Sequence, residues 1–441
     1  MKNFTQIVFI LLISVGNVFS QQEKGITGNN NWLRNWTEFK PNQVDYGEPT
    51  QILTGNITAD VTLKKGDIYL LLGSVFVTNN ATLTIQPGTV IIGDYKTKGS
   101  LTISKGARIE AKGVMTDPIV FTSNRSVKRA GDWGGVIILG DAPINRYGSG
   151  SAASYYQNLN GADYANTNYG GDNEICNSGI MEYVRIEYAG KRISSDKYFS
   201  GLLLACVGRE TSINNVMVSH SAGDSYLVWG GQVNLNRLVS YKSNGTDFKF
   251  KYGSNSKIKN SLAVRSPYIS SPLGSRSLEV ISFDKKEEFD FSNIKTNVKA
   301  VNLTLLNDSD SLESDIKMNL VKEAIYVGQD ATFEMDKSVV SGFNPAVILD
   351  NGITVNQNSL ENIAFTDMYF NNCKGNIFLE NNTNNEDLEN WYGNAAFFNV
   401  YSKSSNTETF IDLKNSRRPD YRLRINKIIA SNEVDSELSF D

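Results

Sequence analysis

The stretch that decides the fold is Ala81-Thr-Leu-Thr-Ile-Gln-Pro-Gly-Thr-Val-Ile-Ile-Gly93, which alternates apolar and polar residues before Pro87-Gly88 and is apolar after it. A second stretch repeats this design with Lys105-Gly106 at the turn: Gly99-Ser-Leu-Thr-Ile-Ser-Lys-Gly-Ala-Arg-Ile-Glu-Ala-Lys-Gly113. Such alternation is typical of a strand with one buried face, and glycine supplies the backbone angles that tight turns need. The two stretches predict short strands joined by turns.

Further short strands follow at regular intervals. In a first group, the apolar residues that begin the strands are nearly equally spaced along the chain: Leu83, Leu101, Ile119 and Val136. In a second group the spacing is somewhat wider: Val216, Leu238 and Leu262. Strands this short bury a core only when a coil of about 20 residues stacks on the next one, with parallel pairing between coils. We therefore predict an all-β fold, a right-handed parallel β-helix (solenoid), most clearly over residues 81–280.

A β-sandwich or barrel is the competing all-β fold. Its hairpins would place Asn-Gly or Asp-Gly pairs at strand junctions. Asn244-Gly245 and Asn351-Gly352 are such pairs, but they stand alone. The solenoid is therefore favoured.

The repeats also predict how the chain is organised. We expect N-terminal strands that cap the solenoid (21–80), the β-helix itself (81–380) with a long insertion (147–177), and a C-terminal capping segment and tail (381–441). Two short helices are expected within the less regular C-terminal part, at 315–324 with Asp315 as its cap and at 386–392.

The first 20 residues are typical of a signal peptide. Lys2 supplies the positive charge, an apolar run covers residues 7–15, and Val18 and Ser20 are the small residues before the cleavage point. The apolar run is shorter than the roughly 20 residues of a spanning helix. We therefore expect an exported protein with no transmembrane segment.

Composition excludes some partners and leaves the cysteines open. The formal net charge is −4 with no long basic block, so nucleic acid is not an expected partner. Of the three cysteines, Cys176 and Cys206 could form a disulfide in an oxidising compartment, with Cys373 left over. The alternative is that all three are small buried residues of a stacked core.

The insertion at 147–177 is rich in Gly, Ser, Asn and Tyr and lacks an apolar period. Loops of this length are usually functional or disordered. Its tyrosines predict an aromatic contact surface for sugars or a protein partner: Tyr155, Tyr156, Tyr164 and Tyr169. The alternative is that they pack the loop onto the coil.

Three stretches resemble exported parallel β-helix proteins of Bacteroidota, a largely uncharacterised envelope family: 82–93, 131–140 and 181–190. The opening 31–41 is similar as well, so the resemblance covers roughly residues 30–270. It implies a β-helix fold and a place in a Gram-negative envelope, in the periplasm, at the outer membrane or at the cell surface, and it brings no settled active site. Relatives often carry an acidic run where this chain has Gly245-Thr-Asp-Phe-Lys-Phe-Lys-Tyr-Gly253, so a cation site carried by that run is not expected here.

The candidate chemistry gathers on neighbouring coils. Acids, bases and possible sugar platforms recur over a short span, in a set of six residues: Asp224, Trp229, Asp247, Lys249, Lys251 and Tyr252. Arg185 and Glu187 lie earlier, on one strand face by their spacing of two. The simpler interpretation is that Lys249 and Lys251 line a solvated face while Phe248 and Phe250 stack inside.

Catalytic signatures are weak. His220 is the only histidine and so the only possible base for a Ser-His-Asp triad, yet its neighbouring serines would point to the opposite face and no nucleophile elbow exists. A site of several histidines is excluded by count, and the cysteines lack zinc-ligand spacing, so no metal or cofactor is predicted.

Two hypotheses of function follow. The first is a non-catalytic envelope protein that presents a β-helix surface to an outer-membrane partner, such as a TonB-dependent transporter, or to a glycan. The second is a polysaccharide lyase or glycoside hydrolase that uses the groove of the helix. The first is favoured. Acids and bases that converge at a common distance in the groove would support the second, and an even spread along the groove would support the first.

Overall fold

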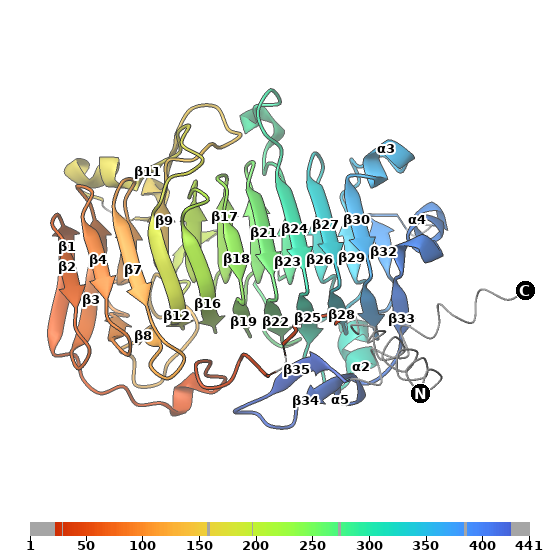
Figure 1. Cartoon of the computed structure of the whole chain (residues 1–441), viewed down its shortest axis with the longest axis horizontal. Coiled ribbons are helices and arrows are strands. Elements are labelled where there is room, and N and C mark those ends of the chain that lie inside the picture. The colour runs from red at the N-terminus through yellow and green to blue at the C-terminus, as the bar shows by residue number, and fades with distance from the viewer. Residues whose placement is uncertain are drawn as a thin grey trace, which may run out of the picture.

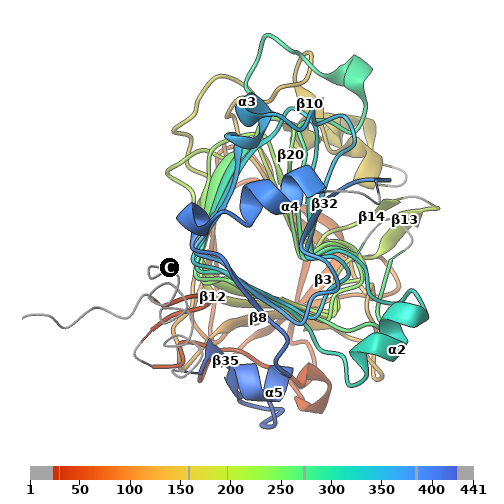
Figure 2. The same ribbon diagram turned by 90° about the vertical axis from the view of Figure 1, so that its right-hand side faces the viewer.

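The computed structural model describes residues 23–424 except 29, 157–158, 196, 272–274 and 383–385. It is a right-handed parallel β-helix, seen from the side in Figure 1 and end-on in Figure 2. The predicted fold class is confirmed. The predicted signal peptide (1–20) and the tail from 425 lie outside the described residues.

Each coil contributes strands to three parallel ladders. The first ladder faces away from the viewer in Figure 1 and consists of the end of β3 (Ile68–Val77), β6 (Ser100–Ile103), β9 (Val136–Leu139), β15 (Leu202–Ala205), β17 (Tyr226–Trp229), β20 (Phe248–Lys251), β23 (Leu278–Val280), β26 (Ile325–Val327), β29 (Val347–Leu349) and β32 (Ile377–Leu379).

The second ladder faces the viewer in Figure 1. It consists of β2 (Val61–Leu63), β4 (Thr82–Ile85), β7 (Arg108–Lys112), the starts of β12 (Gly179–Glu187) and β16 (Ser212–Ser219), β18 (Asn234–Asn236), β21 (Asn255–Lys259), β24 (Asn297–Val301), β27 (Thr332–Asp336) and β30 (Ile363–Thr366).

The third ladder forms the lower side of the solenoid in Figure 1. It consists of most of β1 (Gln51–Ile57), the start of β3, β5 (Val90–Gly93), β8 (Ile119–Ser123), the ends of β12 and β16, β19 (Val239–Tyr241), β22 (Leu262–Arg265), β25 (Thr304–Asn307), β28 (Val339–Ser341), β31 (Tyr369–Asn371) and β33 (Val400–Ser402).

Alternation along each strand decides what lies inside. On the first ladder, register partners from five successive coils form one continuous inner row: Val228, Phe250, Val280, Val327 and Leu349. All five are fully buried. At about 25 cal/mol per Å² of apolar surface, such rows are the main source of stability, because no single coil encloses a core.

The coil period differs from part of the sequence pattern. Met217, Val239 and Leu262 are register partners on successive coils, which agrees with the wider steps of the second group of strand starts. Leu83, however, pairs with Ile109 and not with Leu101. The shorter spacing in the first group is therefore the number of residues between strands of different ladders. It is not the number of residues in one coil.

The N-terminal part covers the solenoid lengthwise. Residues 24–49, here called the strap, run along the third ladder at the bottom of Figure 1. Ile26 N–H donates to Thr304 Oγ1 at 3.0 Å, and Trp36 is buried in a cluster that includes Met217 and Leu262. The strands expected to cap the solenoid within 21–80 are instead β1–β3, which pair in parallel as its first coils, so the solenoid begins near Gln51 rather than at 81.

The C-terminal end is covered by α4 (Glu386–Tyr392), which lies across it in Figure 2 and confirms the helix expected there. Leu388 and Tyr392 enter the core. The hairpin of β34 (Phe410–Asp412) and β35 (Asp420–Leu423) packs beside the strap. The other helical turns are η1 (Pro41–Gln43), η2 (Ala153–Tyr155), η3 (Gly161–Thr167), η4 (Lys286–Glu288), η5 (Ala395–Phe397), α2 (Leu312–Lys317), α3 (Gln357–Leu360) and α5 (Asn406–Thr409).

The helix expected at 315–324 was placed too late. The observed α2 begins after Ser311, and Asp315 lies within it. Its carboxylate accepts a hydrogen bond from Ser309 Oγ at 2.6 Å, so Asp315 serves the loop before the helix and is not its cap.

Three loops rise from the first ladder. The insertion carries the small pair β10 (Gly150–Ser151) and β11 (Asn168–Tyr169), and a hairpin follows with β13 (Arg192–Ser194) and β14 (Lys197–Tyr198). A third long loop separates β23 from β24. Figure 2 shows β10 and the β13–β14 hairpin on the same side of the solenoid as β32.

The three cysteines are free thiols, so no disulfide between Cys176 and Cys206 is present. Cys206 is buried and Cys176 is partly buried. Within the described residues, no helix is long and apolar enough to cross a membrane.

Trp36→Ala is expected to release the strap while the parallel ladders stay intact. Replacing a fully buried tryptophan by alanine costs about 3–5 kcal/mol, and Trp32, Leu33 and Phe39 of the strap pack in the same cluster. Limited proteolysis should then cut within residues 24–49 much earlier, with little change in far-ultraviolet circular dichroism. Arg34→Ala is the control, since Arg34 is exposed on the same segment. Equal cleavage rates in both variants would contradict this role of Trp36.

Candidate functional site

The candidate site lies on β20, where side chains alternate between the core and the outer face. Phe248 and Phe250 belong to the core and are fully buried. Lys249 and Lys251 leave on the outer side of the first ladder. The inner position of the phenylalanines is confirmed, but the face is not simply solvated, because Lys251 is only 8% exposed.

Both lysines have carboxylate partners on the following coil and its loop. Lys249 Nζ lies 3.0 Å from Glu279 Oε1 on β23, and Lys251 Nζ lies 2.5 Å from Asp284 Oδ2. Arg276 Nη1 contacts the other oxygen of Glu279 at 3.2 Å. The ammonium groups are thus held in place, and Asp284 leaves part of its carboxylate open to solvent.

Burial shifts the acid–base properties of the site. Burial lowers the pKa of Lys251, and the nearby Asp284 carboxylate offsets only part of this effect. Burial also raises the pKa of Asp224, against the opposing charge of Lys249. Asp224 Oδ1 accepts a hydrogen bond from the backbone N–H of Thr246 at 2.7 Å. Shifts of this kind occur at catalytic centres and also in structural ion networks.

Aromatic rings close one wall. The Trp229 ring lies 5.8 Å from Tyr155, 5.7 Å from Tyr169 and 6.0 Å from Tyr252. Each of these side chains is less than one-tenth exposed. The rings therefore form a second apolar core between the insertion and the coil. Cations of the site lie over two of them: Lys197 Nζ lies 4.3 Å from the centre of the Tyr155 ring, and Lys251 Nζ lies 4.7 Å from the centre of the Tyr252 ring.

The aromatic contact surface predicted for the insertion is therefore corrected. Tyr155 and Tyr156 are buried, and the Tyr156 ring lies 5.1 Å from Phe76 on the solenoid. Tyr164 is the one of the predicted four that is exposed, at 54%. The tyrosines mainly fasten the insertion to the first ladder, which in turn builds a wall above the lysines.

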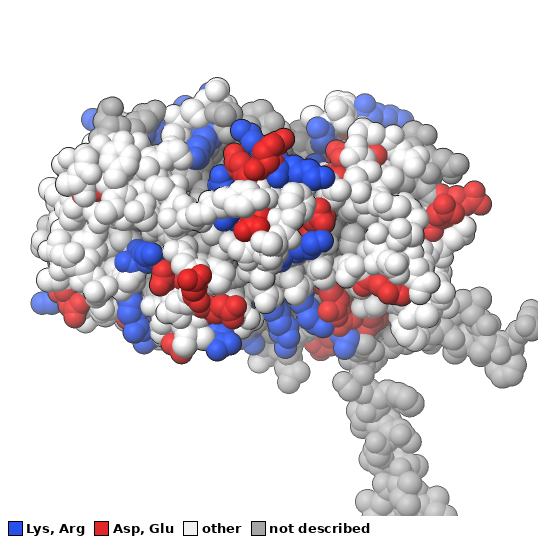
Figure 3. All heavy atoms as spheres, turned by 90° about the horizontal axis from the view of Figure 1, so that it is seen from above, with Lys and Arg blue, Asp and Glu red and all other residues white. Residues whose placement is uncertain are grey.

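The resulting pocket, here called the lysine cleft, has a volume of about 300 Å³. The insertion, the β13–β14 hairpin and the loop after β23 frame it. Four cations, two carboxylates and five aromatic side chains line it: Arg146, Lys197, Lys249, Lys251, Asp224, Asp284, Tyr155, Tyr169, Tyr198, Trp229 and Tyr252. Figure 3 shows charged side chains of both signs gathered over the middle of the upper face.

The structure brings together six of the ten predicted site residues in this cleft: Asp224, Trp229, Lys249, Lys251, Tyr252 and Tyr155. Asp247 does not belong to it. Its carboxylate is completely buried and lies 3.0 Å from Arg265 Nη1, with a hydrogen bond from Ser240 Oγ at 2.5 Å. Asp247 therefore ties together the turns that enter the first ladder.

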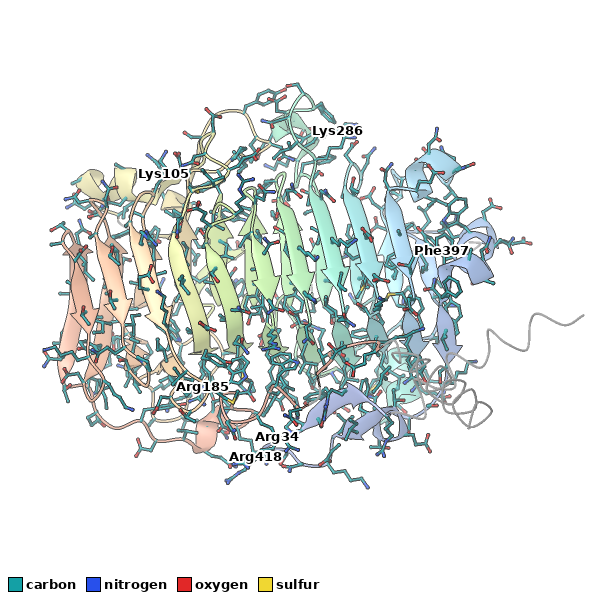
Figure 4. The ribbon with its side chains drawn as sticks, in the orientation of Figure 1. Arg34, Lys105, Arg185, Lys286, Phe397 and Arg418 are labelled. Atoms are coloured by element: carbon teal, nitrogen blue, oxygen red, sulfur yellow. The ribbon has the colours of Figure 1, made fainter. Side chains whose placement is uncertain are left out.

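Arg185 and Glu187 share one strand face as predicted, 3.5 Å apart, but that face belongs to the third ladder. Tyr46 of the strap donates to Glu187 Oε1 at 3.0 Å and accepts from Arg185 Nη2 at 2.9 Å. Figure 4 shows Arg185 on the lower side and Lys286 on a loop of the upper side. The pair fastens the strap and is remote from the lysine cleft.

Sequence reasoning missed Arg146, Lys197 and Asp284. Asp284 binds Lys251, and the guanidinium of Arg146 lies 5.0 Å from the centre of the Tyr252 ring. All three stand in loops or a hairpin outside the repeat, so the alternation that revealed Lys249 and Lys251 carries no signal for them.

No metal or triad chemistry is evident in the described part of the chain. It contains no group of three or more His, Cys, Asp or Glu side chains that could hold a metal ion. The His220 ring stacks on Tyr188 at 5.4 Å and meets the edge of Tyr241 at 5.8 Å. Burial lowers its pKa to about 4.

A family model described as a pectate-lyase-like β-helix domain matches residues 55–410. The chain belongs to this family. The match covers most of the solenoid and agrees with its start in β1. Membership establishes the fold of this pectate-lyase-like protein and leaves its activity open.

Known proteins add little to the family assignment. No curated protein matches the sequence. Among solved structures, pectate lyase Pel9A is similar at 10% identity with a TM-score of 0.35, over 86% of this chain and 90% of that chain. A similarity this low carries no inference about substrate or catalytic residues.

Asp247→Asn is expected to destabilise the protein by about 3–5 kcal/mol, because it leaves the buried Arg265 guanidinium without its counter-charge. The melting temperature and the urea midpoint measure the effect. The matched control is Asp117→Asn, which removes an exposed pair with Lys65 and should cost less than about 1 kcal/mol. Equal effects of the two substitutions would contradict the structural role of Asp247.

His220 should titrate near pH 4 in the folded protein. Its folded pKa is depressed below the ordinary value of about 6.5, so the unfolded chain binds this proton more tightly. The resulting stability is present above about pH 6.5 and is lost as the pH falls towards the folded value. NMR of the single histidine measures the pKa directly. Tyr188→Ala should move the pKa upward, and a wild-type value near 6.5 would contradict the expected lowering of the pKa.

Proposed function

We propose that this pectate-lyase-like protein is an exported glycan-binding protein of the cell envelope, and that the lysine cleft binds an acidic polysaccharide without cleaving it. The observation that carries the proposal is the convergence of four cationic side chains and a mostly buried aromatic cluster in one cleft. Neither the cations alone nor the aromatic rings alone would select an acidic sugar.

The chemistry of the cleft complements a uronate-containing chain. Lys249 and Lys251 offer fixed positive charge to carboxylates, and Asp224 and Asp284 offer acceptors to hydroxyl groups. The aromatic rings add apolar surface against which sugar rings can pack. A volume of about 300 Å³ is at the lower end of small-molecule sites, so the cleft suits a short segment of chain.

The ion pairs favour binding over cleavage. Burial lowers the pKa of Lys249, but Glu279 and Asp224 outweigh it and hold the pKa above its ordinary value, so this ammonium stays protonated. Burial raises the pKa of Glu279, yet Lys249 and Arg276 hold it below its usual range. Neither group is suited to exchange a proton with a substrate near neutral pH.

A polysaccharide lyase is the second candidate, and one observation favours it. The pKa of Lys251 is lowered by burial, which is the direction that a proton-abstracting lysine needs. Its Nζ is, however, already engaged by both oxygens of Asp284, at 2.7 and 2.5 Å. Abstraction would require a substrate that displaces this carboxylate.

Export rests on the signal peptide predicted at 1–20, and the envelope location rests on the resemblance to exported β-helix proteins of Bacteroidota. An outer-membrane partner, such as a TonB-dependent transporter, stays a prediction. Affinity capture of the tagged protein from native outer membranes, with mass spectrometry of the recovered proteins, would identify such a partner.

Lys251→Gln should weaken binding of oligogalacturonate by about tenfold, because one charge contact in a partly desolvated cleft is lost. Isothermal titration calorimetry measures the affinity, and rising salt should weaken wild-type binding as well. The matched control is Lys257→Gln, which makes the same charge change at an exposed position of β21. A neutral glucan should bind to neither protein.

The same samples decide between binding and cleavage. Unsaturated uronate ends that form with the wild type and disappear in Lys251→Gln would replace the binding proposal by the lyase. Equal affinity of Lys251→Gln and Lys257→Gln for the acidic oligosaccharide would remove the lysine cleft from the function altogether.

A further inference from the structure

A second pocket lies where the strap meets the edge of the third ladder, with a volume of about 620 Å³. Here it is called the seam pocket. Its walls come from the strap, the loop between β8 and β9, the turns after β12, β16 and β19, and the loop after β22: Phe39, Lys40, Asn42, Lys128, Arg129, Ala130, Tyr188, His220, Tyr241, Lys242, Asn244, Tyr268, Ile269 and Ser270. It is separate from the lysine cleft, with which it shares no residue.

One wall is a ladder of side chains from three successive coils. Tyr188, His220 and Lys242 follow the last strand residue of their coils, at φ of 60°, 53° and 51°. Their backbone N–H groups continue the parallel pairing, since Tyr188 donates to Ser219 O and His220 to Tyr241 O, both at 3.0 Å. Two stacked rings and an ammonium group therefore face the strap in a row.

The charge of the seam pocket is one-sided. Four cations line it, and none of its lining residues is acidic. Lys242 has an ion pair with Asp308 at 3.0 Å. Among the described residues, no ion pair engages Lys40, Lys128 or Arg129. The lysine cleft differs in this respect, because Asp224 and Asp284 are among its lining residues.

Neutral hydrogen-bonding groups complete the pocket. Asn42, Asn244 and Ser270 offer amides and a hydroxyl. Tyr268 also belongs to the lining; its ring is exposed, and its hydroxyl donates to Asp315 Oδ1 at 3.2 Å. A cationic pocket with these neighbours matches a small ligand that carries an oxyanion beside hydroxyl groups.

We propose that the seam pocket is a second ligand site, which binds a small oxyanion: a sulfate, a phosphate or the carboxylate of a sugar acid. This site is independent of the glycan binding proposed for the lysine cleft. Its occupant bridges the strap to the coil, so binding fastens the N-terminal segment as well.

The single histidine makes the site directly observable. With a tag that contains no histidine, ¹³C-histidine labelling yields one side-chain signal, that of His220 on the pocket wall. Inorganic phosphate, sulfate and glucuronate are titrated separately into the full-length protein at pH 7, against sodium chloride of equal ionic strength. We expect a saturable shift of the His220 signal with at least one oxyanion and none with chloride. The oxyanion that binds most tightly identifies the chemical class of the ligand.

Variants assign the effect to the pocket. Lys128→Gln combined with Arg129→Gln should weaken the saturable binding by at least about tenfold, since two charge contacts are lost. Both side chains are at least partly exposed, so folding should be preserved. Lys257→Gln, on an exposed face of β21, should leave the affinity unchanged.

Three outcomes would overturn the proposal: no saturable shift with any oxyanion, a shift that chloride reproduces, or equal affinity in the double variant and the wild type. Lys251→Gln in the lysine cleft should not change the titration of His220. Failure of the seam pocket and failure of the cleft are therefore distinguishable, because each is tested by its own variants and its own ligand series.

Discussion

The structure depends on one constraint, which is the in-register parallel pairing of each coil with the next. A short strand satisfies its backbone groups only through its neighbours, and its inner side chains pack only on the equivalent residues above and below. The inner row from Val228 to Leu349 shows the result. Because the pairing fixes only the strands, turns can lengthen without disturbing the core.

Function follows from that freedom. The outer positions of β17 and β20 would be an ordinary solvated face if the turns were short. The insertion, the β13–β14 hairpin and the loop after β23 instead build walls over Lys249 and Lys251 and lower the dielectric around them. The strap likewise builds a wall at the edge of the third ladder, over the seam pocket. Both pockets therefore arise where a non-repeating segment covers a repeating face.

The limits of sequence reasoning have physical causes. Alternation revealed Lys249 and Lys251 because a strand places every second side chain outside. The same alternation grouped Asp247 with the two lysines. Asp247, however, lies in the turn before β20, where strand alternation does not hold, and its carboxylate points inward to Arg265. Asp284 could not be found, because the loop that brings it to Lys251 follows no period.

The sequence by itself determined the solenoid, its alternating faces and the position of its long insertion, because these depend on local periodicity and turn chemistry. Tertiary structure decided which outer residues meet, that Tyr155 and Trp229 form a packed wall, and that the strap covers the third ladder. These contacts join segments far apart in the chain, and their energies depend on burial that no local pattern encodes.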